Sequence, residues 1–203
     1  MNKYFDTLSQ LSAGKIHLSS NEILYKEGSR ADNLFGIQHG SLIVYKNDKQ
    51  NKFLFPRFIK SGQILPLNTL QSGVYRDTAQ TLTPVEAFLL NGYDVKHLLN
   101  KDIQLRIGIM QEMCKEISKI ENLDLNHYNK SLKQKTAYIL LEMARACGDD
   151  GIPDHCYKLI PLLLEASHKN WMKILDDLAH EGLIQRHGHK ILVNNPEKMK
   201  KIV

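Results

Sequence analysis

The hydrophobic pattern of the chain changes its period near residue 93, and this change constrains the fold more than any other feature of the sequence. Up to about Leu90 the apolar stretches are short and are separated by glycines or by polar turns such as His39-Gly40, which is typical of β-strands joined by tight turns. Many short strands with regular turns predict an antiparallel β-roll over residues 1–92. The strongest strand signals lie at 23–25, 34–37, 41–45, 53–55 and 87–90.

A helical period follows the roll and predicts one long helix over residues 93–124. Ile103, Met110 and Ile117 recur at seven-residue intervals and make an apolar seam along one helix face. This seam packs either on the chain's own roll or on the same helix of a second chain. A helix of about 30 residues spans about 45 Å, which is longer than the roll covers, so a homodimer is favoured. The predicted dimer interface consists of Ile103, Ile107, Met110, Met113, Cys114, Ile117 and Ile120.

The last part of the chain, residues 125–203, has the element order of a winged helix-turn-helix. An amphipathic helix is expected at 134–147, and a short apolar segment leads from it to a helix at 168–180 with Ser167 as its N-cap. A β-hairpin with a basic tip then closes the unit. The hinge before the unit is expected at 122–131, and the hairpin strands at 183–186 and 190–193.

The first helix of this motif has two possible forms because Pro161 lies within the apolar segment. Either the helix is short and follows Pro161, or it begins near Asp154 and is kinked at Pro161. Lys158, Ile160 and Leu164 have the spacing of the longer helix, and this form is favoured.

The helix at 168–180 has the chemistry of a DNA-reading helix. Trp171, Ile174 and Leu175 lie on one face, so the polar face is free to enter a major groove, where Lys, Asn and His donate hydrogen bonds to bases and phosphates. Basic residues of the hairpin would reach neighbouring phosphates and add salt-dependent affinity. The alternative is a winged helix that binds protein and has a solvated basic face. The predicted DNA-binding residues are Ser167, His168, Lys169, Asn170, Lys173, Arg186, His187 and Lys190.

The charge and cysteine content limit the class of protein. The chain has 203 residues, with 27 Lys and Arg against 22 Asp and Glu, and this mild excess permits an anionic partner without demonstrating one. No apolar run reaches the roughly 18–20 residues of a membrane span and no signal peptide is visible, so a cytoplasmic protein without a membrane partner is expected. Cys114, Cys147 and Cys156 form no CxxC pair, which argues against a disulfide framework or a zinc site.

Three segments together resemble the catabolite activator/fumarate-nitrate regulator (CRP/FNR) family of bacterial transcription factors, over about residues 14–195. Residues 27–41, from Glu-Gly-Ser to His-Gly-Ser, are similar to the family's early β-roll pattern, and Ser61-Gly62-Gln63-Ile64 is similar to the start of its effector loop. Residues 167–175, with the hairpin after them, are similar to its recognition helix and wing. The resemblance implies a homodimer, a double-stranded DNA operator, and an effector pocket between roll and long helix, with RNA polymerase as a further candidate partner.

The sequence departs from the cyclic nucleotide-binding members of the family where those members hold the nucleotide. Gln63 follows Gly62 at the position of their ribose-binding Glu, and Asp77 precedes Thr78 at the position of the Arg that binds the cyclic phosphate. Because an aspartate repels a phosphate, we expect no tight binding of cAMP or cGMP.

No cofactor is expected. The oxygen-sensing branch of the family holds an iron-sulfur cluster on a cysteine-rich N-terminus, whereas residues 1–113 contain no cysteine. Haem-sensing members use Cys and His ligands, but His17, His39 and His97 are isolated in the sequence. These patterns disfavour an iron-sulfur cluster, haem and any other bound metal.

The effector pocket is expected to be apolar, with an arginine and a hydroxyl. Tyr75 and Arg76 follow the apolar effector loop, and Ser118 matches, by the resemblance, a polar residue that contacts the effector in nucleotide-binding members. Such a pocket suits a small organic acid or an aromatic anion, while the alternative is that its apolar residues simply pack the roll. The effector-binding candidates are Leu65, Leu67, Tyr75, Arg76, Thr78 and Ser118.

The sequence therefore predicts an α+β protein that acts as a homodimeric, sequence-specific transcriptional regulator and does not respond to cAMP. The main alternative is a regulator that is constitutive or controlled by a protein partner and has a vestigial effector pocket. A small β-barrel metal enzyme is disfavoured, because the roll lacks clustered His and Glu ligands and the chain lacks GxSxG, HExxH and P-loop motifs. No catalytic residue is expected.

Overall fold

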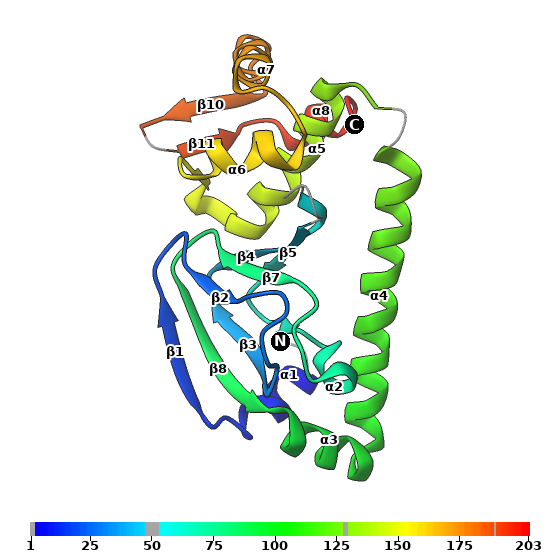
Figure 1. The fold of residues 1–203 in the computed structure, drawn as a ribbon. Helices are drawn as coiled ribbons and strands as arrows, with labels where there is room; N and C mark the ends of the chain where they lie inside the picture. The colour runs from blue at the N-terminus through cyan, green and yellow to red at the C-terminus, as the bar shows by residue number, and fades with distance from the viewer. Residues whose placement is uncertain (1–2, 48–52, 128–129, 189) are drawn as a thin grey trace.

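A computed structural model describes residues 3–47, 53–127, 130–188 and 190–203. Figure 1 shows a β-roll, a long helix α4 (Ile103–His127) along one side of it, and a helical unit with a small sheet stacked on the end of the roll. The predicted α+β fold class is confirmed. Among the described residues, no helix is long and apolar enough to cross a membrane.

The roll is built from antiparallel strands, and each of the predicted strand signals lies within one of them. Three further strands were not predicted from the sequence. In the strand at 14–18 apolar and polar residues alternate, the strand at 64–65 has only two residues, and the strand at 78–81 has the sequence Thr-Ala-Gln-Thr. The strands are β1 (Gly14–Leu18), β2 (Ile23–Tyr25), β3 (Asn33–His39), β4 (Ser41–Asn47), β5 (Phe53–Lys60), β6 (Ile64–Leu65), β7 (Thr78–Thr81) and β8 (Val85–Asn91).

Two four-stranded sheets enclose the core of the roll, in the orders β1-β8-β3-β6 and β2-β7-β4-β5. Their inner faces meet at fully buried side chains such as Ile37 and Leu42. The turn from β3 to β4 requires Gly40, whose φ is +87°. A side chain at this position would place its Cβ 2.1 Å from the carbonyl oxygen of Pro84, so only glycine fits the turn.

The helix predicted over 93–124 is divided in the structure. α3 (Gly92–Lys101) ends before Asp102, whose backbone is extended, and α4 begins at the next residue. The Asp102 carboxylate accepts a hydrogen bond from the amide of Leu105 at 3.0 Å and so caps the N-terminus of α4. α4 continues to His127, so the predicted hinge begins later than residue 122. The short helices α1 (Lys3–Ser9) and α2 (Thr69–Ser72) lie near the same end of α4.

The C-terminal unit has the predicted order of elements. Ser131 and Gln134 form a capping box at the start of the first helix, and a three-stranded sheet has the order β10-β11-β9. The proposed domain boundaries at residues 92 and 124 stay predictions. The elements are α5 (Leu132–Cys147), the 3₁₀ turn η1 (Gly148–Asp150), β9 (Ile152–Pro153), α6 (Cys156–Leu163), α7 (His168–His180), β10 (Ile184–His187), β11 (Lys190–Val193) and α8 (Pro196–Lys200).

Helix α6 contains Pro161, as in the longer of the two forms considered, and it starts at Cys156, two residues after the predicted Asp154. The Leu164 amide still donates to the carbonyl of Ile160 at 3.0 Å, so the helical turn continues past the proline. Ile160 and Pro161 are both buried.

The C-terminal unit packs directly on the roll. Ile43 and Leu82 of the roll are fully buried in the same apolar cluster as Leu140 of α5 and Ile160 of α6. This contact leaves α7 at the far end of the molecule, away from the roll (Figure 1).

Candidate DNA interface, dimer face and effector pocket

Helix α7 presents a polar face to solvent. The Ser167 hydroxyl accepts a hydrogen bond from the Asn170 amide at 3.2 Å, as expected of an N-cap. Trp171, Leu175 and Leu178 are fully buried and fix the helix on its apolar side. The predicted DNA-contacting residues of this segment are all exposed, so the structure brings them to one surface: Ser167, His168, Lys169, Asn170 and Lys173.

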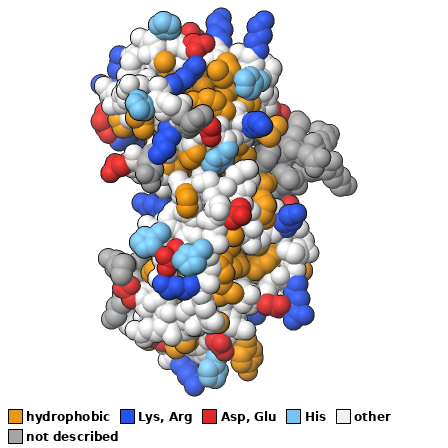
Figure 2. All heavy atoms as spheres, turned by 90° about the vertical axis from the view of Figure 1, so that its left-hand side faces the viewer, with side chains coloured by type: hydrophobic (Ala, Val, Ile, Leu, Met, Phe, Trp, Pro, Cys, Tyr) orange, Lys and Arg blue, Asp and Glu red, His pale blue; other side chains and the backbone are white. Residues whose placement is uncertain are grey.

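The β-hairpin lies beside α7, and its basic residues differ in their solvent exposure and in their ion pairs. His187 and Lys190 are exposed and pair across the hairpin. Arg186 instead forms an ion pair with Asp176 of α7, at 2.7 Å between Nη2 and Oδ1. The charge of Arg186 is therefore compensated within the chain, which the sequence alone did not indicate. Figure 2 shows lysine and histidine side chains, among a few carboxylates, over this end of the molecule.

Most of the apolar seam of α4 is exposed to solvent, and its residues Met113 and Ile117 also border a cavity next to the roll. The residues of α4 that pack inward are Leu105 and Ile109, which join Tyr4, Phe5 and Leu8 in one buried cluster. The exposure of the seam side chains favours the second of the two alternatives, in which the seam packs on the same helix of another chain. The side chain of Ile120 lies outside the described residues. The exposed seam residues are Ile103, Ile107, Met110, Met113 and Ile117, at 41–61% exposure, together with Cys114.

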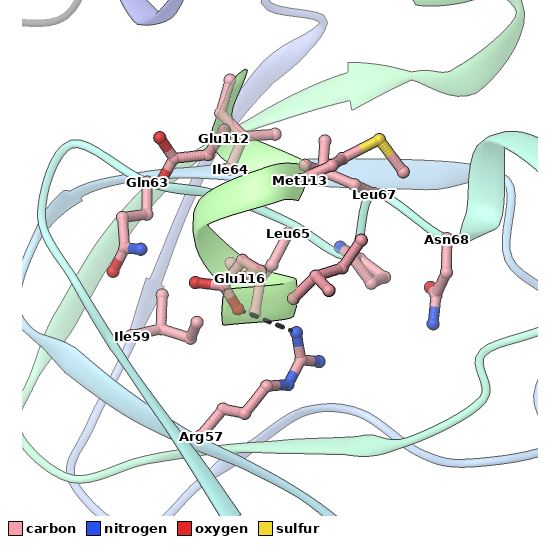
Figure 3. Close-up of a pocket in the computed structure, with 12 residues that line it drawn as sticks. Arg57, Ile59, Gln63, Ile64, Leu65, Leu67, Asn68, Glu112, Met113 and Glu116 are labelled. Carbon is pink, nitrogen blue, oxygen red and sulfur yellow. Dashed lines mark hydrogen bonds and ion pairs between the residues drawn. The ribbon is translucent and has the colours of Figure 1, made fainter. Parts of the chain in front are cut away.

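A cavity of about 170 Å³ lies between the effector loop and α4. Figure 3 shows Glu112 on the side of Gln63, Met113 on the side of Leu67, and Arg57 joined to Glu116 by an ion pair. Most of its remaining surface is apolar, as predicted. Its lining residues are Arg57, Ile59, Gln63, Ile64, Leu65, Pro66, Leu67, Asn68, Glu112, Met113, Glu116 and Ile117.

Only Leu65 and Leu67 of the predicted effector residues line this cavity. Tyr75 is buried in the roll, where its ring stacks on that of Tyr25 with centroids 4.3 Å apart. Thr78 accepts a hydrogen bond from the Glu27 amide. Tyr75, Arg76, Thr78 and Ser118 do not line this cavity, and Arg76 and Ser118 are exposed to solvent. Their assignment as effector-binding residues stays a prediction.

The arginine of the cavity is Arg57, which sequence reasoning missed. Its Nη2 lies 2.8 Å from Asp77 Oδ2, and its Nη1 lies 3.2 Å from Glu116 Oε2. The Tyr25 hydroxyl donates to the other Asp77 oxygen at 3.1 Å. Burial, reinforced by the Asp77 carboxylate, raises the pKa of Tyr25 well above its usual value, so its phenol keeps the proton that it donates. The signal in the sequence was a single charge inside the apolar run of β5.

The two histidines of the roll lie on either side of one carboxylate. His17 of β1 and His39 of β3 both lie opposite Glu86 of β8, and Glu86 is paired with Lys15 at 2.7 Å. Within the part of the chain that the structure describes, no group of three or more His, Cys, Asp or Glu side chains is arranged to hold a metal ion.

Comparisons with known proteins agree with this architecture. Residues 15–102 match the family model of the cyclic nucleotide-binding domain. The chain is 24% identical over 174 residues to the probable transcriptional regulator flp of Lacticaseibacillus casei, a match that covers 83% of this chain and 78% of that protein.

Solved structures of similar fold cover nearly the whole chain. FixK2 from Bradyrhizobium japonicum superposes with a TM-score of 0.79 at 18% identity, over 93% of this chain and 96% of that one. A CRP/FNR family transcriptional regulator from Thermus thermophilus has a TM-score of 0.73 at 16% identity, over 93% and 97% of the two chains. These similarities confirm the resemblance predicted from the sequence at the level of the fold. The chain therefore has the fold of the CRP/FNR regulators of known structure, with a cyclic nucleotide-binding-like domain in its N-terminal part.

Proposed function

We propose that the chain is a homodimeric, sequence-specific DNA-binding regulator of transcription whose activity does not depend on cyclic AMP. The observation that carries this proposal is the surface of α7. Lys169, Asn170 and Lys173 are exposed on a helix that Trp171 and Leu175 hold from behind, at the end of the molecule remote from the roll. A helix supported in this way enters a major groove without disturbing its own core.

The exposed seam of α4 supports the homodimer. An apolar stripe along a 25-residue helix is costly to leave in water and fits a second copy of the same helix. A two-fold dimer would present two copies of α7 to successive major grooves of one duplex. RNA polymerase as a further partner stays a prediction.

The ion pairs of Arg57 support the lack of a cyclic AMP response. Asp77 and Glu116 already hold the Arg57 guanidinium, and no carboxylate stands at Gln63 to bind a ribose. A cyclic phosphate would have to enter beside these carboxylates, which repel it. Isothermal titration of the full chain with cyclic AMP is expected to show no binding in the micromolar range, and micromolar binding would overturn this part of the proposal.

A second candidate is a regulator that is constitutive or controlled by a protein partner. It is favoured by the bridge from Arg57 on β5 to Glu116 on α4, since this bridge joins roll and helix without a ligand. A constitutive regulator would bind its operator tightly as purified, with a Kd of about 10⁻⁸ M or lower at physiological salt. Weak binding that rises on adding a small molecule would exclude it.

DNA binding is tested on duplexes that the purified full chain selects from a random library. Lys169→Ala and Lys173→Ala are each expected to weaken binding by roughly 5-fold to 100-fold, since a lost base or phosphate contact costs about 1–3 kcal/mol. Lys96→Ala on α3 is the matched control, because it removes the same charge from an exposed position on the roll side of the chain. Unchanged affinity for both α7 variants, measured by fluorescence anisotropy, would contradict the assignment.

A further inference from the structure

The cavity between the effector loop and α4 has the size of a one-ring molecule. Its volume is about 170 Å³, and an apolar protein cavity of about 150 Å³ accommodates benzene. The walls around it are suited to an apolar body, with Ile59, Leu65, Leu67, Met113 and Ile117 among the lining residues.

The charged part of the wall is acidic overall. The carboxylates of Glu112 and Glu116 line the cavity, with side chains 12% and 18% exposed. The single guanidinium there, Arg57, is shared between Glu116, at 3.2 Å, and Asp77, at 2.8 Å, so it does not balance Glu112 as well. Lys115 lies near Glu112, at 3.4 Å, but its side chain is 64% exposed and its charge is largely screened by solvent.

These charges reverse the expectation of an organic acid as ligand. That expectation rested on Arg76 and Ser118, and neither residue lines the cavity. In a partly buried site the field of neighbouring carboxylates is less screened than in water, so it repels an anion and attracts a cation.

We propose that this cavity binds a small primary amine whose apolar body is about the size of one aromatic ring. The apolar body would pack among Leu65, Leu67 and Met113, and the ammonium group would lie against Glu112. Such an amine is charged at pH 7. The role of this ligand as the effector rests on the proposed function, whereas its binding to the cavity does not.

A ligand in the cavity would contact residues that also belong to the proposed dimer face. Met113 and Ile117 line the cavity and also belong to the exposed seam of α4. A ligand that packs against these two side chains would alter the surface that the second copy of α4 contacts.

The test compares three probes that share one ring and differ in one group: benzylamine, benzyl alcohol and benzoate. Titration of the full chain, followed by calorimetry at pH 7 and low salt, is expected to show benzylamine binding at least 10-fold more tightly than benzoate, with benzyl alcohol between them. Benzoate binding as tightly as benzylamine would overturn the proposal, and so would the absence of benzylamine binding up to millimolar concentration.

Two variants locate the binding and identify its charge. Leu67→Trp fills the cavity and is expected to abolish benzylamine binding, whereas Leu162→Trp, at an exposed position on α6, is expected to leave it unchanged. Glu112→Gln keeps the shape of the side chain and is expected to reduce the preference for amine over alcohol at least 5-fold. A preference that survives this change, or binding that survives Leu67→Trp, contradicts the site. DNA affinity without any probe is measured separately, so a failure of DNA binding is distinguishable from a failure of this proposal.

Discussion

Arg57 Nη2 lies 2.8 Å from Asp77 Oδ2, so the acid at the position of the family's phosphate-binding arginine is paired with an arginine from another strand. The two side chains are 27% and 12% exposed, and Arg57 also reaches Glu116 on the long helix. The charges of Arg57, Asp77 and Glu116 therefore form ion pairs that hold β5, the segment before β7, and α4 together.

This pairing predicts a stability cost when the charge of Asp77 is removed. Asp77→Asn keeps an oxygen for the Tyr25 hydroxyl but leaves Arg57 with Glu116 alone, so the free energy of unfolding is expected to fall by about 2 kcal/mol. Asp32→Asn is the control, because Asp32 and Arg30 form an ion pair of equal length, 2.8 Å, that is largely solvated and contributes less than about 1 kcal/mol. Urea denaturation compares the two variants, and equal losses would contradict a structural role for Asp77.

The exposed seam predicts that a charge in its centre prevents dimerisation. In Ile107→Glu the new carboxylate would be buried between the two copies of α4, where an unpaired charge is strongly unfavourable. Light scattering after size exclusion at tens of micromolar is expected to give twice the 23.3 kDa chain mass for the natural sequence and the single mass for the variant. Gln104→Glu places the same group on α4 outside the seam and should stay dimeric. A monomeric natural chain would contradict the dimer.

The Arg186–Asp176 pair predicts that removing an acid from α7 strengthens DNA binding. Asp176→Ala frees the Arg186 guanidinium for a phosphate, so the slope of log K against log salt concentration is expected to become steeper by about 1. Asp177→Ala removes a neighbouring exposed acid for which no contact with Arg186 is seen. It is expected to change affinity slightly and to leave the slope near its original value. Equal slopes for both variants would show that Arg186 does not reach the DNA.

His155, at the start of α6, predicts a loss of stability in acid. Burial lowers its pKa, an effect that Asp154 opposes only in part, so the folded state holds the neutral imidazole. A lowered pKa means that the folded state binds fewer protons than the unfolded state. The stability from this group is therefore full above about pH 6.5 and is lost as the pH falls through the folded-state pKa.

Two histidine variants test whether His155 causes this loss of stability at low pH. His155→Gln is expected to flatten the fall in urea midpoint between pH 7.5 and pH 5, whereas His180→Gln, at an exposed position on α7, is expected to keep it. A natural chain whose stability does not change over this range would contradict the prediction.

Elements with a local signal were predictable from the sequence. The bounds of α7 and the N-cap Ser167 follow from neighbouring residues, and the structure has both as expected. The break at Asp102 was missed because the apolar period continues across it, while the capping hydrogen bond depends on one short side chain. The spacing of the apolar residues located the seam on α4, but not whether it is buried or exposed. That depends on which side of α4 is covered by α1.

The effector pocket was the least predictable part of the molecule. Arg57 and Asp77 are 20 residues apart in the chain, and Arg57 and Glu116 are 59 apart, so only strand pairing and the packing of α4 bring them together. Sequence adjacency favoured Arg76, which the turn before β7 leaves in solvent. The resemblance identified Gln63 and Asp77 as departures from a nucleotide site, but it did not indicate that Arg57 and Glu116 line the cavity.

The central claim, a dimer that reads DNA through α7, is tested most directly by the symmetry of the duplexes that the purified chain selects from a random library. We predict enrichment of two inverted half-sites with centres about 10–10.5 base pairs apart, one helical turn. Selection that enriches no sequence, or that enriches a single asymmetric site, would contradict it.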